Sequence, residues 1–135
     1  MTSAPNGPAG LTIVESPHHV PETVERLIGA LEKAGNTIFA RVDHAAGATA
    51  VGLSMKPMQL VLFGNPASGT PLMLAAPTFG IDLPMKILVW ESESGVHIGT
   101  NSLAWLSERH GVATLLRQKL ETMEMRLREL ISSAL

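Results

Sequence analysis

The chain of 135 residues contains no cysteine and no tyrosine, and it has few aromatic and few charged residues. Without cysteine, the protein cannot form a disulfide, a thiolate nucleophile or a thiolate-bound metal site. Only 16% of the residues are charged, the net charge is −2, and Lys and Arg do not cluster. A surface for nucleic acid or for an anionic membrane needs such a cluster. We therefore expect neither nucleic acid nor a membrane among the partners.

The sequence also lacks a long apolar run. No segment reaches the roughly 20 apolar residues of a membrane-spanning helix, and the first ten residues lack the basic start and apolar centre of a signal peptide. Residues 1–10 are instead rich in Pro, Gly and small polar residues, which predicts a flexible N-terminal tail. The remaining residues, 11–135, have the length of a single domain. We expect a single-domain, cytoplasmic protein.

Hydrophobic periodicity predicts the order of the elements. Runs of apolar or alternating residues predict five strands, at 11–16, 37–42, 58–63, 86–90 and 96–100. Apolar residues three or four apart predict a helix from Pro21 to a C-cap at Gly35, short helices after Asp43, Thr70 and Ser102, and a long helix from Val112 onward. This order fits an α/β protein of the α+β type. We expect a two-layer sandwich in which a mixed sheet of about five strands has helices mainly on one face and a long C-terminal helix.

The stretch from Lys56 to Pro84 has the features of a binding site. Its apolar strand predicts a position near the middle of the sheet, buried on both faces. Gly64 then permits a positive φ, and Pro66 pushes Asn65 toward extended backbone. The chain is therefore expected to turn sharply after the strand and to present the amide of Asn65 outward.

A helix start is expected a few residues later. Thr70 and Pro71 are the residue types favoured at the N-cap and at the first helical position. Free N–H groups at that helix start, together with Asn65 and Lys56, predict a cradle for an anion or a carbonyl group. The stretch matches neither nucleotide-binding glycine motif. It can also be interpreted as a strand-to-helix connection that needs Gly and Pro for geometry alone.

His44 is the residue best suited to proton transfer. Asp43 is expected to cap a short helix, which places His44 on the first helical turn, where the helix dipole favours a neutral imidazole. A histidine exchanges its proton near neutral pH, so His44 is the candidate general acid or base. It can equally be a histidine that only hydrogen-bonds a neighbouring loop. The adjacent pair His18 and His19 predicts no metal site, because adjacent residues in a turn point apart and no third ligand lies at a suitable spacing.

Several short motifs together resemble one known family. They are Asp43-His44-Ala45-Ala46, Gly52-Leu53, Pro57, Phe63-Gly64-Asn65-Pro66, Gly69-Thr70 followed by Leu72-Met73, and Leu83-Pro84-Met85-Lys86. As a set, they resemble the bacterial and archaeal family catalogued as domain of unknown function 302, over nearly the whole chain from about Leu11. Met85 departs from the mostly Leu-type residue expected after Leu83-Pro84. The resemblance implies a compact two-layer α/β fold, often a homodimer, with no assigned activity.

Three classes of function stay open. The first is a homodimeric module that binds a small anion or carbonyl ligand, without a metal or cofactor, through Asp43, His44, Lys56, Asn65, Gly69 and Thr70. The second is a small enzyme in which His44 acts as general acid or base, while Asn65 or loop N–H groups stabilise negative charge. The third is a purely structural interaction module.

The binding module is the expectation that we carry forward. No second catalytic carboxylate is evident, since Asp82 is expected only to brace the turn before Leu83-Pro84 or to pair with Lys86. The homodimer is expected because the strands at 58–63 and 87–90 do not alternate cleanly. Both faces of the sheet would then be apolar, and a second subunit would cover the face that the helices leave open.

Overall fold

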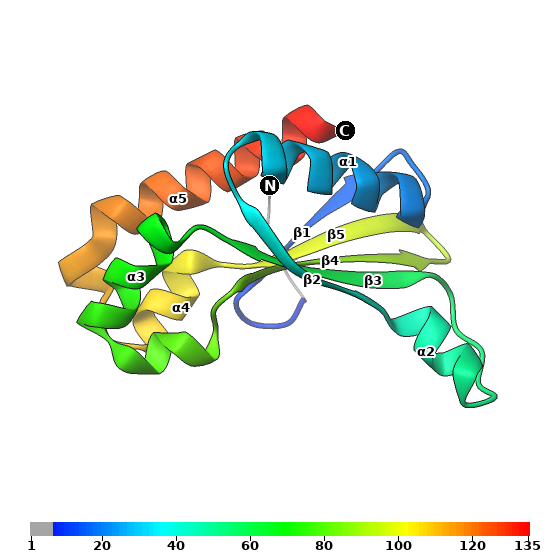
Figure 1. Cartoon of the computed structure of the whole chain (residues 1–135), viewed down its shortest axis with the longest axis horizontal. Helices are drawn as coiled ribbons and strands as arrows, with labels where there is room; N and C mark the ends of the chain where they lie inside the picture. The colour runs from blue at the N-terminus through cyan, green and yellow to red at the C-terminus, as the bar shows by residue number, and fades with distance from the viewer. Residues whose placement is uncertain (1–6) are drawn as a thin grey trace.

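A computed structural model describes residues 7–135, so the first six residues of the predicted tail lie outside the described residues. Five strands and a set of helices follow one another along the chain (Figure 1). In order they are β1 (Leu11–Ser16), α1 (Val20–Lys33), β2 (Thr37–Asp43), α2 (His44–Ala50), β3 (Met58–Gly64), α3 (Pro66–Ala75), the 3₁₀ helix η1 (Pro77–Ile81), β4 (Met85–Ser92), β5 (Gly95–Asn101), α4 (Leu103–Arg109) and α5 (Ala113–Ala134). The predicted α/β class, the five strands and the long C-terminal helix are confirmed.

The five strands form one sheet in the order β1-β5-β4-β3-β2, and each neighbouring pair is antiparallel. The prediction of a mixed sheet is therefore wrong in this respect. A strand–helix–strand connection favours parallel neighbours only when the two strands pair with each other. Here α1 carries the chain from β1 at one edge to β2 at the other, so these two strands never meet.

The main core lies between the sheet and the helices α1 and α5, which run over the same face (Figure 1). Val24, Leu27 and Leu31 of α1 are fully buried against Val61 of β3 and Ile87 of β4. Both of these strands alternate buried and half-buried residues. The expectation that the strand at 58–63 is buried on both faces is therefore wrong, because one face of the sheet has no helix packed on it.

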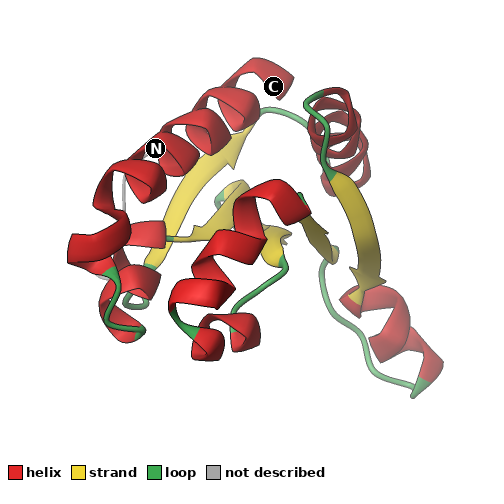
Figure 2. Cartoon of the chain, turned by 60° about the vertical axis from the view of Figure 1, so that its left-hand side comes forward, coloured by secondary structure: helices red, strands yellow, loops and turns green. Residues whose placement is uncertain are grey.

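A second cluster of buried residues fills one end of the molecule, where α3, η1 and α4 gather around the first half of α5 (Figure 2). Leu72, Phe79, Leu103, Leu106 and Leu120 form its centre. The long helix contributes to both clusters, with Leu120 in this one and Leu127 and Ile131 in the main core. Its backbone leaves helical geometry at Leu116, near the start of the helix.

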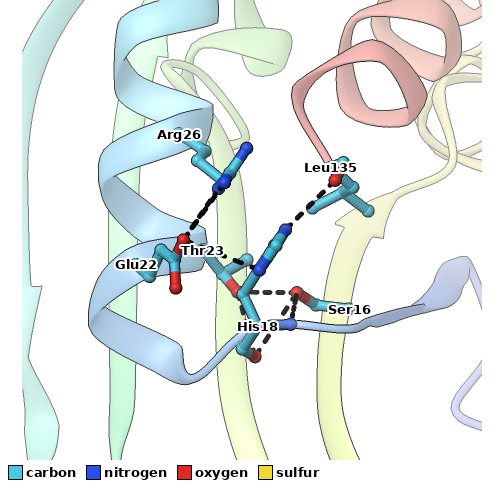
Figure 3. A network of polar contacts seen from close by, with 6 residues as sticks. All are labelled: Ser16, His18, Glu22, Thr23, Arg26 and Leu135. Atoms are coloured by element: carbon cyan, nitrogen blue, oxygen red, sulfur yellow. Dashed lines mark hydrogen bonds and ion pairs between the residues drawn. The ribbon is translucent and has the colours of Figure 1, made fainter.

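A polar network holds the turn between β1 and α1 to the end of α5 (Figure 3). The hydroxyl of Ser16 lies 2.6 Å from the hydroxyl of Thr23 and accepts a hydrogen bond from the backbone N–H of His18. The Nε2 atom of His18 lies 3.1 Å from the carbonyl oxygen of Leu135, and its Nδ1 atom lies 3.6 Å from Glu22. The network thus joins segments that are distant in the sequence.

Ordered contacts begin before β1. The carbonyl oxygen of Gly10 accepts a hydrogen bond of 2.6 Å from the N–H of Ser102, and Gly10 has a positive φ of 77°. The indole ring of Trp105 lies so close that a Cβ at position 10 would collide with it. The end of the predicted tail is therefore packed against the start of α4.

We predict that Leu127→Asp strongly destabilises the protein. Leu127 lies on the face of α5 that packs on the sheet and is only 7% exposed, so an aspartate there would bury an unpaired charge at a cost of several kcal/mol. Leu115→Asp, on the 74%-exposed side of the same helix, is the matched control and should change the free energy of unfolding by about 0.5 kcal/mol or less. Equal midpoints of urea unfolding for the two variants would contradict this assignment of the core.

Candidate functional site

A cavity of about 930 Å³ opens at the end of β3, between the last turn of α1, the start of α3 and the middle of α5. Most of its wall is apolar and is formed by residues such as Phe39, Phe63, Met73, Met85, Met123 and Leu130. Polar residues also reach it, among them Lys33, Asn65, Ser68, Thr70, Arg126 and Glu129. An apolar pocket with a few polar groups is typical of small-molecule sites.

Asn65 stands at this cavity because it caps α3. Its side-chain oxygen accepts a hydrogen bond of 2.9 Å from the N–H of Ala67, and Pro66 takes the first helical position. The prediction that the helix starts after Thr70 is therefore wrong. Asn65-Pro66 offers the same cap-and-proline pair as Thr70-Pro71 and comes first, so Pro71 falls inside the helix, where it has no N–H to donate.

The earlier helix start changes which donors a ligand can use. The N–H groups of Ser68 and Gly69 both bond to the carbonyl oxygen of Asn65, at 2.9 and 3.0 Å, and the N–H of Ala67 is used by the cap. The expected cradle of free backbone N–H groups is thus already occupied. Within residues 7–135, the side-chain NH₂ of Asn65 and the hydroxyls of Ser68 and Thr70 make no hydrogen bond, so these groups face the cavity as available donors.

Gly64 is needed at this site for a different reason from the predicted one. It does not have a positive φ. A Cβ at this position would instead lie 3.3 Å from the ring of Phe39 on the neighbouring strand. Glycine therefore makes room for an aromatic side chain of the cavity wall.

The other predicted site residues lie at the opposite end of the sheet. Asp43 pairs with Gln59 near the start of β3, whereas Gly64 at its end pairs with Thr37. Five residues of strand separate the two positions, which is about 17 Å at 3.3–3.4 Å per residue. The structure thus brings Asn65, Gly69 and Thr70 together and leaves Asp43, His44 and Lys56 elsewhere.

Each residue of this distant group has another local setting. Asp43 caps α2, as predicted, by accepting a hydrogen bond of 2.9 Å from the N–H of Ala46. His44 is exposed and makes no hydrogen bond within residues 7–135, and Lys56 lies 3.3 Å from Glu93 in an ion pair. His44 and Asn65 are therefore too far apart to act on one small substrate, and the prediction of an enzyme that uses both is wrong.

Asp82 has partners that the sequence reasoning missed. Its carboxylate lies 2.5 Å from Nε2 of His110 and accepts two hydrogen bonds from Arg109, at 3.0 and 3.1 Å. The Nδ1 atom of His110 lies 2.8 Å from the hydroxyl of Thr78. Lys86, the expected partner of the Asp82 side chain, donates instead to the backbone oxygens of Asp82 and Pro84. These contacts join η1 to the end of α4.

Sequence spacing could not reveal this group, because its members come from segments almost thirty residues apart. The one available signal was the adjacent pair Arg109-His110 at a predicted helix end. None of the four side chains lines the cavity. We assign them to the joint between η1 and α4 rather than to the candidate site.

Two cations stand at the cavity without an acidic partner. Neither Lys33 nor Arg126 forms an ion pair within residues 7–135, although other arginines of the helices do, such as Arg26 with Glu22 and Arg117 with Glu121. Glu129 is the acidic residue of the wall. The positive charges and the donors of α3 lie around one apolar space, so the arrangement suits an apolar ligand with a negatively polarised end.

Comparison with curated proteins finds similarity to channels. The chain is 47% identical over 105 residues to "Fluoride-specific ion channel FluC 1" of Brucella suis, with 77% of this chain and 41% of that protein covered. It has the same identity to FluC 1 of Brucella abortus, of which 39% is covered. The chain thus spans about two fifths of the length of these relatives. Among residues 7–135, no helix has both the length and the apolar character needed to cross a bilayer.

Comparison with solved structures confirms the fold. The crystal structure of an uncharacterized conserved protein DUF302 from Bacillus stearothermophilus has a TM-score of 0.84 and is 20% identical, with 95% of this chain and 100% of that chain covered. At that identity, the similarity shows the fold alone. The family pattern itself matches residues 12–133, almost the whole chain. The chain therefore belongs to the family described as "Domain of unknown function DUF302".

Proposed function

We propose that the protein is a binding module for a small ligand that has an apolar body and an anionic or carbonyl end. The observation that carries this proposal is the cavity at the end of β3, where an apolar wall meets Lys33, Arg126 and the side-chain NH₂ of Asn65. Its volume of about 930 Å³ falls within the usual range for small-molecule sites. The cytoplasmic location expected from the sequence is part of this proposal.

The wall of the cavity suits an apolar ligand of variable shape. Three methionines, Met73, Met85 and Met123, line it together with Phe39 and Phe63. Methionine side chains are unbranched and adapt to irregular shapes, and each buried CH₂ group of a ligand contributes about 0.8 kcal/mol. The wall therefore supplies affinity, while the polar groups select the end of the ligand.

One of the polar groups is held in place by the backbone. The side-chain oxygen of Asn65 accepts the hydrogen bond that caps α3, which fixes the direction of its NH₂ group. Polar groups held in place bind with a small entropic cost. Among residues 7–135, no histidine lines the cavity, so the enzyme first considered, with His44 as its acid or base, has no counterpart there. Binding is the better supported class.

We propose a homodimer formed through the arm that carries α2. This helix has seven residues and buries none of them, and it projects from the body in both views (Figures 1 and 2). A helix this short is marginal in isolation. The arm and the adjoining end of β2 also expose large apolar side chains: Val42, Val51, Leu53 and Met55.

A second copy is the partner that this patch suits. In the described sheet, β2 is an edge strand, and an edge strand offers unpaired backbone groups to another strand. In a twofold dimer, both subunits use the same surface, so the apolar patch of one copy would pack against the apolar patch of the other.

The similarity to channels favours a second candidate, in which the chain serves as an accessory unit of a fluoride channel. The observation behind it is the 47% identity to part of the FluC proteins. In this candidate, binding of a ligand in the cavity changes the activity of the channel. Deleting the chain from its host should change the fluoride concentration that halts growth, and Arg126→Ala should reproduce that change. Unchanged fluoride tolerance in the deletion would contradict it.

The ligand site can be tested with decanoate as the probe. We predict that decanoate raises the melting temperature of the protein and that Asn65→Asp abolishes this rise. The aspartate keeps the oxygen that caps α3 but replaces the donating NH₂ with negative charge. The melting temperature without ligand should therefore stay within a few degrees of the wild type.

Three further variants complete the test. Arg126→Ala should weaken decanoate binding at least several-fold in calorimetry, whereas Arg117→Ala, an exposed arginine on the same helix outside the cavity, should not. His44→Ala should also leave binding unchanged, because His44 lies at the other end of the sheet. If decanoate and other medium-chain carboxylates fail to bind the wild type, the proposed ligand class is wrong.

The dimer has its own test. We predict that light scattering at micromolar concentration gives twice the chain mass of 14.3 kDa and that Leu53→Asp gives the single-chain mass. Leu53 is 67% exposed in one chain, so the variant should still fold. Leu74→Asp, at a residue that is 80% exposed on α3, is the control that should remain dimeric. A wild type with the mass of one chain contradicts the proposal.

A further inference from the structure

A second polar cluster lies on the face of the sheet that the helices leave open. Nδ1 of His97 on β5 lies 2.8 Å from the carboxylate of Glu15 on β1. Nε2 of the same ring lies 2.5 Å from the hydroxyl of Ser92, at the end of β4. A hydroxyl, an imidazole and a carboxylate are thus joined in series, the arrangement that activates a serine nucleophile.

Neighbouring residues fix the orientation of the imidazole. Glu15 and His97 are directly opposite each other in the β1–β5 ladder. The ring of Trp90 lies 5.2 Å from the ring of His97, at an angle of 31°. Trp90 lies above Gly99, where a Cβ would come within 3.0 Å of the indole. His97 is therefore only 12% exposed, although it belongs to the open face.

The order of the contacts gives the imidazole the required tautomer. A carboxylate at Nδ1 favours the proton on that nitrogen, which leaves Nε2 as an acceptor for the Ser92 hydroxyl proton. The oxygen of Ser92 also accepts a hydrogen bond of 3.2 Å from the N–H of Ser94. The hydroxyl of Ser94 also lies 3.0 Å from that of Ser92, whereas Nε2 of His97 is nearer, at 2.5 Å. The shorter contact favours His97 as the acceptor of the Ser92 proton.

The joint around His110 does not offer the same chemistry. There the carboxylate of Asp82 is already neutralised by Arg109, and the hydroxyl belongs to a secondary alcohol, Thr78. In contrast, Ser92 is a primary alcohol, and no cation contacts Glu15 within residues 7–135 apart from His97 when it is protonated. The Ser92 cluster is therefore the better candidate for nucleophilic chemistry.

An apolar shelf begins beside Ser92. Trp90 is followed on the same face by Leu88, and the next strands place Leu60 and Ile13 alongside Leu88 and Gly99. These side chains are half-buried, with no helix over them. The shelf can hold the acyl chain of a substrate. The dimer patch is centred on β2, at the opposite edge of the sheet from β1.

We propose that Ser92, His97 and Glu15 form an acyl-transfer site for small apolar carboxylic esters, separate from the ligand cavity. The oxygen of Ser92 attacks the ester carbonyl carbon while its proton passes to Nε2 of His97. The bond to the alkoxy oxygen then breaks, His97 returns the proton to that oxygen, and the alcohol leaves an acyl-serine. Water repeats both steps, which releases the carboxylic acid and restores Ser92.

Glu15 and Glu93 have supporting parts in this scheme. Glu15 is a positioning residue, since it orients His97 and does not touch the ester. The backbone N–H of Glu93, directly after the nucleophile, makes no hydrogen bond within residues 7–135 and is the available donor for the oxyanion.

A fluorophosphonate probe and p-nitrophenyl butyrate test the proposal. In the wild type, mass spectrometry should find the phosphonyl group on the peptide containing Ser92, and the modified residue should be Ser92 itself. Ser92→Ala should lose both the label and the butyrate hydrolysis. Ser132→Ala, at an exposed serine of α5, is the matched control and should keep both.

The remaining variants separate catalysis from folding. His97→Gln should lower hydrolysis about a hundredfold with an unchanged melting profile. Glu15→Gln should lower kcat by a smaller factor and leave KM unchanged, and Glu15→Asp should restore part of the rate, which a purely structural role would not do. The proposal is overturned if the wild type carries no label at Ser92, if the label is on Thr78 or Ser94, or if His97→Gln is labelled at the wild-type rate. The wild-type labelling decides the matter even if a variant fails to fold.

Discussion

The packing of α1 and α5 on one face of the sheet is the constraint on which the rest of the structure depends. Leu27 and Leu31 of α1 and Ile131 of α5 are almost fully buried against the central strands. This packing uses the full length of one face, so the other helices must find places at the ends of the sheet. The cavity, the α2 arm and the open face all result from this one-sided arrangement.

Local patterns were sufficient to predict most elements. The spacing of Val24, Leu27 and Leu31 gives α1, and the run at 58–63 gives β3. The start of α3 could not be decided locally, because Asn65-Pro66 and Thr70-Pro71 carry the same signal. Strand direction was also beyond local reasoning. Whether β1 and β2 pair depends on the position in the sheet that the chain reaches after α1. No short sequence motif determines that position.

Three of the six predicted site residues lie at the cavity, for a related reason. Asn65, Gly69 and Thr70 are close in the sequence, and the helix that contains them keeps them close in space. His44 and Lys56 were grouped with them because the length of the intervening strand was not taken into account. They lie near the start of β3, a strand of seven residues, whereas the cavity lies at its end. Arg126 and Lys33 were missed because they reach the cavity from α5 and α1, and an exposed cation on an amphipathic helix carries no local signal of its own.

The position of β5 between β1 and β4 has a consequence for how the protein acquires its structure. The first strand pairs with the last, Leu11 with Asn101, so its edge stays open until β5 has been made. During synthesis, β2, β3 and β4 can pair with one another while β5, the partner of β1, is still inside the ribosome. Until β5 emerges, β1 has no strand to pair with. Contacts between distant residues slow folding. An unpaired β1 would then be the segment of the nascent chain most in need of protection from aggregation.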